Sequence, residues 1–238
     1  MRGLFVTGTD TGVGKSVLSA CLLAAMAAAG EPVRAYKPVL TGLDDEADAT
    51  GTPGAGARWP PDHELLAAAS GMRPEQVAPL RFGPAVSPHL AAALAGERIE
   101  PSELVALARE HGGEGTLIVE GVGGLLVPLA DSYTVLDLAA DLALGLVIAA
   151  RPGLGTINHT LLTLQAARAA TLDVRAVVLT PWPFQPGEME LSNRDTIARL
   201  GGVAVHTLPA LPGPEPAAMA EAGDALPWRR WLGEHAIS

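Results

Sequence analysis

The chain has 238 residues, 48% of them hydrophobic and 18% charged, which suits one well-packed globular domain and excludes an intrinsically disordered chain. Its 26 acidic residues outnumber its 16 basic ones, and this excess argues against non-specific nucleic-acid binding, which depends on Lys and Arg displacing counterions from phosphates. Apolar runs stay well short of the ~18 residues of a membrane span, so a membrane protein is excluded as well.

The first strand-like run, residues 4–6, comes almost at the start of the sequence, without the basic flank and long apolar stretch of a secretory leader. The single cysteine, Cys21, cannot form an intramolecular disulfide. We therefore expect a soluble cytoplasmic protein with no membrane and no nucleic-acid partner.

Short apolar runs alternate with amphipathic or Ala/Leu-rich stretches, a pattern typical of strands joined by crossover helices in a mostly parallel sheet. The predicted strands are residues 4–7, 33–36, 116–120, 144–149, 174–179 and 203–207. The predicted helices are residues 15–29, 62–69, 88–95, 101–110, 155–170, 191–200 and a C-terminal segment from Trp228. The order of elements predicts an α/β fold in which helices flank the sheet.

Two stretches interrupt this alternation. Residues 42–61 are rich in Gly, Pro, Asp and Thr and lack periodicity, which predicts a long mobile loop of the kind that closes over ligands. Residues 209–216 form a second segment rich in Pro and Gly. Neither is a convincing linker and the sequence has no internal repeat, so we predict one domain over residues 1–238.

The glycine-rich segment from Gly8 to Ser16 lies between a predicted strand and a predicted helix. There its backbone N–H groups and the helix N-terminus converge on phosphate oxygens, which indicates a P-loop NTPase-like fold. Lys15 would reach the β- and γ-phosphates of a nucleotide, and the Ser16 hydroxyl would coordinate Mg²⁺. Thr9, not glycine, stands six residues before Lys15, so the loop is a lengthened form. The alternative is a glycine-rich turn with an incidental lysine.

Glu120 ends an apolar predicted strand and is followed by Gly121-Val122-Gly123-Gly124. Because ligands of open α/β sheets gather at the carboxyl ends of strands, we expect this acid to face the phosphates on the metal side. The alternative is a glutamate in an ordinary surface turn.

Five segments in this order resemble the dethiobiotin synthetase family over nearly the whole chain. They are residues 6–15, residues 36–42 with Lys37-Pro38-Val39 and Thr41-Gly42, Ser87-Pro88-His89, residues 119–124, and residues 154–159 with Gly155-Thr156-Ile157-Asn158-His159. Each later segment is weak alone, but together they are specific.

The resemblance implies a ligase that closes the cyclic urea of dethiobiotin from 7,8-diaminopelargonate, carbon dioxide or bicarbonate, and ATP. In the family a carbamate attacks the γ-phosphate, and the second amine then displaces phosphate from the carbamic-phosphoric anhydride. Lys15 and Lys37 would be catalytic because fixed positive charge stabilises the carbamate and the transferred phosphoryl group. An exposed lysine at a strand end is the alternative for Lys37.

The family also implies the remaining site residues. The Mg²⁺ ligands would be Ser16, Asp62 and Glu120. Asp44, Asp45 and Asp48 compete with Asp62, which a plain helix N-cap role would also explain. The nucleotide-binding residues implied are Gly12, Val13, Gly14, Lys15, Ser16, Val17, Asp62, Glu120, Gly121, Val122, Gly123, Thr180, Pro181, Pro209, Ala210 and Leu211. The substrate-binding residues implied are Thr11, Lys37, Thr41, Gly155, Thr156 and Asn158.

In the family the helix that starts at Gly155 binds the tail carboxylate of a substrate held mainly by the other subunit, which implies a homodimer. A helix N-terminus suits an anion because of its free N–H groups and the helix dipole. A simple helix-start residue is the alternative for Asn158.

The chain departs from the family pattern where the nucleotide base is expected to bind. Thr180-Pro181-Trp182-Pro183 stands where the family has an Asn that reads adenine, and the acid that should follow residues 209–211 is displaced, with Glu215 the nearest candidate. Nucleoside triphosphates other than ATP are therefore expected to serve.

Two other classes share this type of loop. Switch or partitioning ATPases usually carry a lysine near the start of the loop, where this chain has Asp10. Amide-forming synthetases of cofactor biosynthesis need a glutaminase domain with a nucleophilic cysteine, whereas Cys21 lies in an Ala/Leu-rich predicted helix where it is expected to pack.

Overall fold

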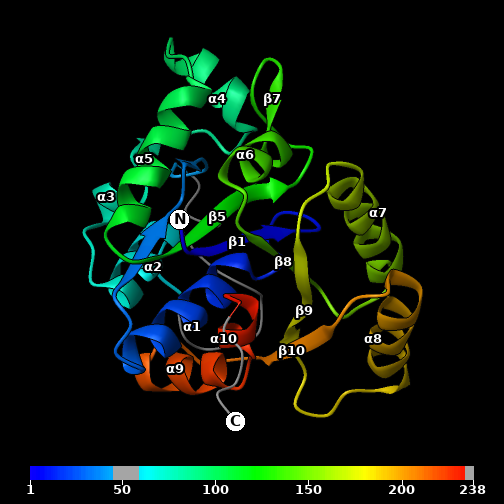
Figure 1. The fold of residues 1–238 in the computed structure, drawn as a ribbon. Coiled ribbons are helices and arrows are strands. Elements are labelled where there is room, and N and C mark those ends of the chain that lie inside the picture. The colour runs from blue at the N-terminus through cyan, green and yellow to red at the C-terminus, as the bar shows by residue number, and fades with distance from the viewer. Residues whose placement is uncertain (45–58, 234–238) are drawn as a thin grey trace.

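A sheet of parallel strands in the order β10-β9-β8-β1-β5-β2 runs through the computed structural model, which describes residues 1–44 and 59–233 (Figure 1). Its strands are β1 Gly3–Gly8, β2 Val33–Tyr36, β5 Thr116–Gly124, β8 Gly145–Ala150, β9 Val174–Trp182 and β10 Val205–Pro209. Strand β1 lies between β5 and β8, so the chain order reverses beside it. Such a reversal opens a crevice at the carboxyl ends of the strands.

All six predicted strands are confirmed, and only the last is displaced, because Gly202 ends the preceding helix at φ 52° and β10 begins at Val205. The shorter strands were not predicted. They are β3 Val39–Leu40, β4 Leu80–Arg81, β6 Pro128–Ala130 and β7 Tyr133–Thr134. Runs of two or three residues are too short to show the alternation on which strand prediction depends.

The helices are α1 Lys15–Ala28, α2 Asp62–Ser70, α3 Pro74–Val77, α4 Pro88–Ala95, α5 Pro101–Gly113, α6 Val135–Leu142, α7 Thr156–Ala169, α8 Glu188–Gly201, α9 Pro216–Asp224 and α10 Trp228–Trp231. The predicted helices are present, whereas α3, α6 and α9 were not predicted. A signal for α6 exists, since the Thr134 hydroxyl and the Asp137 carboxylate form a capping box at its start. None of the described helices is long and apolar enough to cross a membrane.

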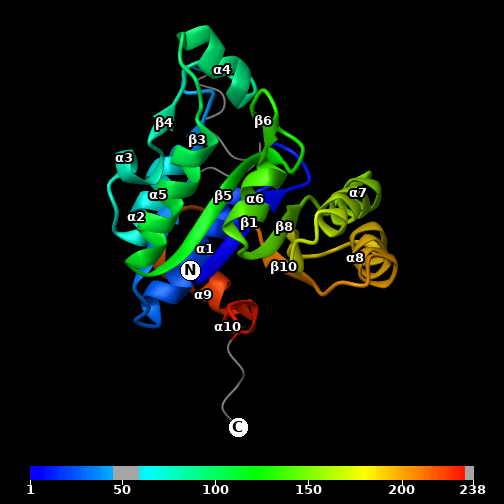
Figure 2. The same ribbon diagram turned by 45° about the horizontal axis from the view of Figure 1, so that its top comes forward.

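The sheet separates two apolar cores, because successive strand side chains point to opposite faces. Leu4 and Val6 of β1 pack with α1, α2, α9 and α10 on one face, whereas Phe5 packs with α5, α6, α7 and α8 on the other. Figures 1 and 2 show α1 beside α9, and α7 beside α8. Burial on both faces explains the continuous apolar character of the strands.

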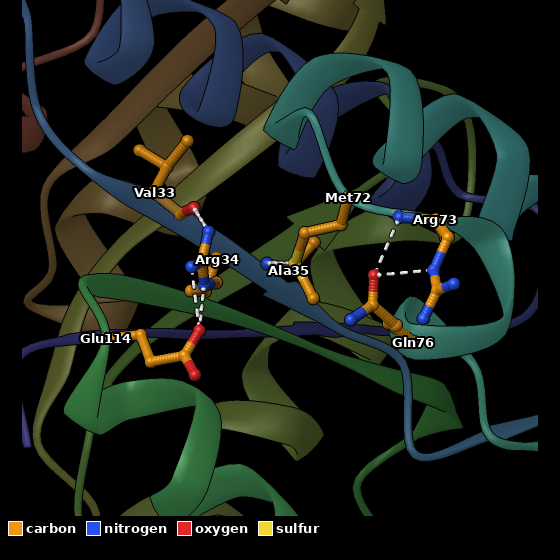
Figure 3. Close-up of polar contacts among 7 residues, drawn as sticks. All are labelled: Val33, Arg34, Ala35, Met72, Arg73, Gln76 and Glu114. Atoms are coloured by element: carbon orange, nitrogen blue, oxygen red, sulfur yellow. Dashed lines mark hydrogen bonds and ion pairs between the residues drawn. The ribbon is translucent and has the colours of Figure 1, made fainter.

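The outer strand β2 is covered by the segment that joins α2 to α3 (Figure 3). The Ala35 N–H points at the Met72 sulfur at 3.3 Å, and the Lys37 N–H donates to the Val77 carbonyl at 2.8 Å. On the same strand, Arg34 contacts the Glu114 carboxylate at 2.7 Å. The contacts of Ala35 and Lys37 occupy backbone N–H groups that another strand would otherwise pair with, and the second fixes the backbone of Lys37 directly after β2.

The packing of α9 on α1 depends on a glycine. A Cβ at Gly223 would lie 2.0 Å from the Cys21 carbonyl oxygen, which is backbone of α1. We predict that Gly223→Ala lowers the free energy of unfolding by about 1–3 kcal/mol, because α9 must shift to admit the methyl group. Urea unfolding followed by circular dichroism measures this. Gly113→Ala is the control, since a Cβ there meets no described atom within 4 Å. Equal losses in both variants would contradict the close packing.

Candidate active site

The segments predicted to carry the site follow strands of the same sheet. The phosphate loop follows β1, Lys37 follows β2, Glu120 lies in β5 opposite Val6, and Thr180 and Pro209 lie near the ends of β9 and β10. Because the strands are parallel, their carboxyl ends lie at one edge of the sheet. The fold therefore brings together residues that are up to 200 positions apart in the sequence.

The phosphate loop has the backbone conformation that its glycines predict. Gly12 and Gly14 have φ of 67° and 89°, in the region that favours glycine. A Cβ at Gly14 would also lie 2.9 Å from the Thr180 methyl group, so a side chain there would collide with β9. Lys15 folds back over the loop and donates to the Asp10 carbonyl at 2.9 Å.

A buried charge cluster lies beside the loop. Lys37 is 4% exposed, and its ammonium donates to Glu120 Oε1 at 2.6 Å and to Asp62 Oδ2. Ser16 Oγ donates to the same oxygen of Glu120 at 2.8 Å, and Glu120 itself is fully buried. The structure thus places Lys37 and all three predicted metal ligands in one connected group.

The two lysines of the site have opposite pKa shifts. Burial lowers the pKa of Lys15 to about 8; the Glu120 carboxylate opposes this shift, and the Lys37 ammonium adds to it. Burial would also lower the pKa of Lys37, but the charges of Asp62 and Glu120 and hydrogen bonds to both outweigh it and raise that pKa. Lys37 is therefore a permanent cation, whereas Lys15 is a cation that an anionic ligand would stabilise. Lys15 is followed by Ser16, whose hydroxyl contacts the same Glu120 oxygen as Lys37, so both lysines belong to one site.

The position of Asp62 separates it from the competing acids. Burial alone would raise the pKa of Asp62, but the charge of Lys37 and the hydrogen bond between the two side chains outweigh it and lower that pKa. The Asp62 side chain is 42% exposed. Asp44 instead lies against Gly83, where an added Cβ would come within 2.5 Å of its carboxylate oxygens. Asp45 and Asp48 fall outside the described residues, as does most of the predicted loop 42–61.

The cluster fits a magnesium ion by one specific observation. Glu120 Oε2 is buried and has no hydrogen-bond partner among the described residues. A buried carboxylate oxygen without a donor is costly, and a cation would satisfy it. The Ser16 hydroxyl and the Asp62 carboxylate supply the further oxygen ligands that Mg²⁺ prefers. In residues 1–44 and 59–233, no three His, Cys, Asp or Glu side chains come together as a metal cage.

The glycines after Glu120 pack directly against the phosphate loop. Gly124 pairs with Gly8 across the two strands, and a Cβ at Gly123 would lie 3.5 Å from the Thr11 hydroxyl. Gly123 has φ of 60°, which also favours glycine. Gly121 and Val122 belong to the same stretch of β5. The small size of the glycines allows β5 to approach the loop.

The predicted base-side residues lie on two neighbouring strand ends. Pro209 is paired with Trp182, and the Ala210 N–H donates to the Trp182 carbonyl at 3.1 Å. Thr180 and Pro181 precede Trp182 on β9, and Leu211 packs against the core on the α1 face. Glu215, the predicted candidate for the acid that follows residues 209–211, is the N-cap residue of α9, and its carboxylate lies over Gly213.

Helix α7 begins where the sequence places it. Gly155 is its N-cap residue at φ 92°, and Thr156 is buried while Asn158 is exposed. Thr41 directly follows β3, and its side chain is partly exposed. Among the described interactions, none joins Thr41 or the start of α7 to the charge cluster, so the substrate-binding role of these residues stays a prediction.

Sequence reasoning missed Arg151, which directly follows β8. Its Nη2 donates to the Thr11 carbonyl of the phosphate loop at 3.0 Å. The signal was available, because a cation after a strand of a parallel sheet lies at the same edge as the phosphate loop. Asn193 of α8 was also missed; it is buried and donates to the Pro152 carbonyl at 2.9 Å.

The fold and this site define a nucleotide-binding protein of the P-loop class. A family model described as "AAA domain" matches residues 2–216. Among solved structures, the MinC:MinD cell division protein complex of Aquifex aeolicus is similar with a TM-score of 0.56 at 14% identity, covering 100% of this chain and 98% of that one. A ParA family ATPase from Chlorobium tepidum TLS has a TM-score of 0.52 at 14% identity, covering 94% and 90%. At these identities the likeness concerns the fold alone.

Closer relatives share one name. An ATP-dependent dethiobiotin synthetase BioD from Anaeromyxobacter sp. (strain Fw109-5) is 40% identical over 217 residues, covering 85% of this chain and 91% of the relative. Proteins of the same name from Mycobacterium sp. (strain JLS) and Bacillus subtilis subsp. natto are 39% and 36% identical, covering 88% and 86% of this chain and 88% and 85% of the relatives. The chain belongs to the ATP-dependent dethiobiotin synthetase family, a family of ligases in biotin biosynthesis, and the resemblance inferred from its motifs is confirmed.

Proposed function

We propose that this chain uses ATP to join 7,8-diaminopelargonate and carbon dioxide into the cyclic urea of dethiobiotin at the edge of the sheet that carries the phosphate loop. The observation that carries the proposal is the position of Lys37, a buried cation that contacts Asp62 and Glu120 beside the phosphate loop, where Ser16 contacts the same Glu120 oxygen. Family membership supplies the substrates, and this arrangement of charges suits their chemistry.

The proposed reaction has three steps. One amine of the substrate adds to carbon dioxide and loses a proton, which gives a carbamate. A carbamate oxygen then attacks the γ-phosphorus of ATP, and ADP leaves. The second amine attacks the carbonyl carbon of the resulting anhydride, phosphate leaves, and the amine proton is released. Negative charge increases at the oxygens around the γ-phosphorus during the second step, where fixed cations are most effective.

The lysines have different roles in this scheme. Lys37 stays protonated because of its two carboxylate neighbours, so it acts as a donor and a fixed charge and not as a base. Lys15 reaches the phosphates. Their negative charge would raise the Lys15 pKa above its value of about 8 and so keep the ammonium protonated. Ser16, Asp62 and Glu120 would hold Mg²⁺, and when bound the ion supplies positive charge to the phosphate oxygens. Thr11 and Thr41 are proposed to contact the diamine.

We predict that Lys37→Gln lowers kcat by about 10²–10³-fold, the scale of losing one preorganised donor to a developing negative charge. The glutamine amide keeps N–H donors on the same side of the site but carries no charge. Release of ADP that depends on both the diamine and bicarbonate measures the effect. Arg73→Gln is the matched control, because Arg73 is the N-cap residue of α3 and its side chain donates to Gln76 at 3.3 Å. A kcat within threefold of the wild type in Lys37→Gln would remove Lys37 from the mechanism.

We also propose that the base site accepts several nucleotides, because Thr180-Pro181-Trp182 stands where the family has an adenine-reading Asn. The described contacts there, between β9 and β10, are made by backbone groups. We predict kcat/KM values for ATP and CTP within about tenfold of each other, a difference of ~1.4 kcal/mol. Steady-state assays with each nucleotide test this, and a preference for ATP above a hundredfold would contradict it.

We further propose a homodimer in which the Gly155–Asn158 helix start of one subunit binds the tail carboxylate of substrate held by the other. Supporting this, about half of the exposed large apolar side chains of the described residues belong to α7, α8 and the segments that flank them. They include Leu154 at 94%, Leu162 at 56%, Phe184 at 97% and Leu200 at 56% exposure. Large exposed apolar side chains are candidates for burial at an interface.

Co-expression of two inactive variants tests the shared site. Asn158→Asp places a negative charge where the carboxylate is proposed to bind, and Lys37→Gln removes the catalytic cation. If the two residues serve one site from different subunits, random pairing restores about a quarter of wild-type activity, because half the dimers are mixed and each has one intact site. Activity no higher than the sum of the separate variants, or a monomer mass of 24.4 kDa by light scattering, would contradict the shared site.

A further inference from the structure

Arg151 places a guanidinium against the phosphate loop from outside the loop itself. It follows β8, the strand paired with β1 on the side away from β5. Its Nη2 donates to the Thr11 carbonyl at 3.0 Å and lies 3.3 Å from the place of a Cβ at Gly12. Lys15 holds the neighbouring carbonyl, that of Asp10, at 2.9 Å. Two cations from different elements thus hold consecutive peptide groups of one loop.

Most of the hydrogen-bonding capacity of Arg151 is unused. The guanidinium has five N–H donors, and the described contacts use one of them. The side chain is exposed, and within residues 1–44 and 59–233 it forms no ion pair, whereas Arg34, Arg175, Arg194 and Arg229 each contact an acid. An arginine that faces a phosphate-binding loop without a carboxylate partner has its charge available to an anionic ligand.

The segment that carries Arg151 is held in place. Asn193 of α8 is 7% exposed and donates its amide to the Pro152 carbonyl at 2.9 Å and to the Gly153 carbonyl at 3.3 Å. On the other side, β8 is fixed between β1 and β9. The position of the Arg151 backbone is therefore set by both flanking elements, which favours a preorganised contact over a mobile surface side chain.

We propose that Arg151 is a third cation of the reaction site and that its free donors bind an oxygen of the terminal phosphate of the nucleotide, beside Lys15 and Lys37. The proposal rests on the proposed function and adds a catalytic residue to it. The planar guanidinium suits phosphate oxygens, and an arginine at a transferred phosphoryl group stabilises the charge that develops there. The interaction with Thr11 holds the guanidinium at the loop, where the phosphate would lie.

A comparison of ATP with ADP binding isolates the contact of Arg151 with the terminal phosphate. We predict that Arg151→Gln weakens ATP binding by about tenfold and leaves ADP binding within twofold, measured by titration calorimetry with Mg²⁺ and without the diamine. In the full reaction kcat falls by at least about 10²-fold, and the KM for the diamine stays within twofold. Arg151→Lys, which keeps the charge but loses the fork, recovers part of both losses. Arg73→Gln is the control for an arginine outside the site and leaves all four values unchanged.

Each other outcome overturns the assignment. Equal weakening of ATP and ADP binding would show that Arg151 only supports the loop. A change confined to the KM of the diamine would assign the guanidinium to the substrate carboxylate, and unchanged values throughout would remove it from the site. Wild-type protein that binds ATP but releases no diamine-dependent ADP would refute the proposed function separately, because the comparison of ATP and ADP binding needs no turnover.

Discussion

Glu120 is a carboxylate with no exposed surface, and a charge in that position is stable only when a cation lies next to it. Lys37 provides that cation at 2.6 Å. The pair constrains several other features, because Lys37 directly follows β2 and Glu120 lies in β5, and the charges meet where these two strands are neighbours. Placing β5 between β1 and β2 then puts Glu120 beside the phosphate loop, where Ser16 reaches it. Removing either partner would leave the other buried without its counter-charge.

Glycines near the site allow neighbouring strands to lie close to the backbone of the phosphate loop. Strand β9 lies two strands from β1, yet the Thr180 side chain would collide with any side chain at position 14. Gly124 similarly lies against Gly8 at the end of β1. The loop is therefore enclosed by β5 on one side and by the segment after β8 on the other, with little space for rearrangement. That rigidity suits catalysis by fixed charges, which loses effect when the charges must first move into place.

The sequence was sufficient for the elements with strong local signals. Strands buried on both faces are long apolar runs, and Gly12, Gly14 and Lys15 have a spacing that few structures other than a phosphate loop explain. The contact of Lys37 with Glu120 could be anticipated only through family resemblance, because 83 residues separate them and nothing local encodes their approach. The contacts of Asn193 are 40 and 41 residues away in the sequence, so they too have no local signal, whereas the place of Arg151 directly after a strand could have indicated its side of the sheet. Helix α6 was not predicted although its Thr134–Asp137 cap is local, because its eight residues give only about two turns of helical periodicity.

The chain has a net charge of −10 and yet has to bind a negatively charged triphosphate. The site shows how both are possible. Exposed charges farther than a Debye length of ~8 Å are largely screened by salt, so the surface acids add little at the loop. Lys15 and Lys37 are 7% and 4% exposed, so their charges act through a medium that screens them much less. The local field is therefore set by a few buried cations and by loop N–H groups. The solved ATPases of similar fold show that the sheet alone does not determine function. What separates this chain from a switch ATPase is chemical: Asp10 stands where such proteins usually carry a lysine, and the additional cation at the loop comes from the end of β8.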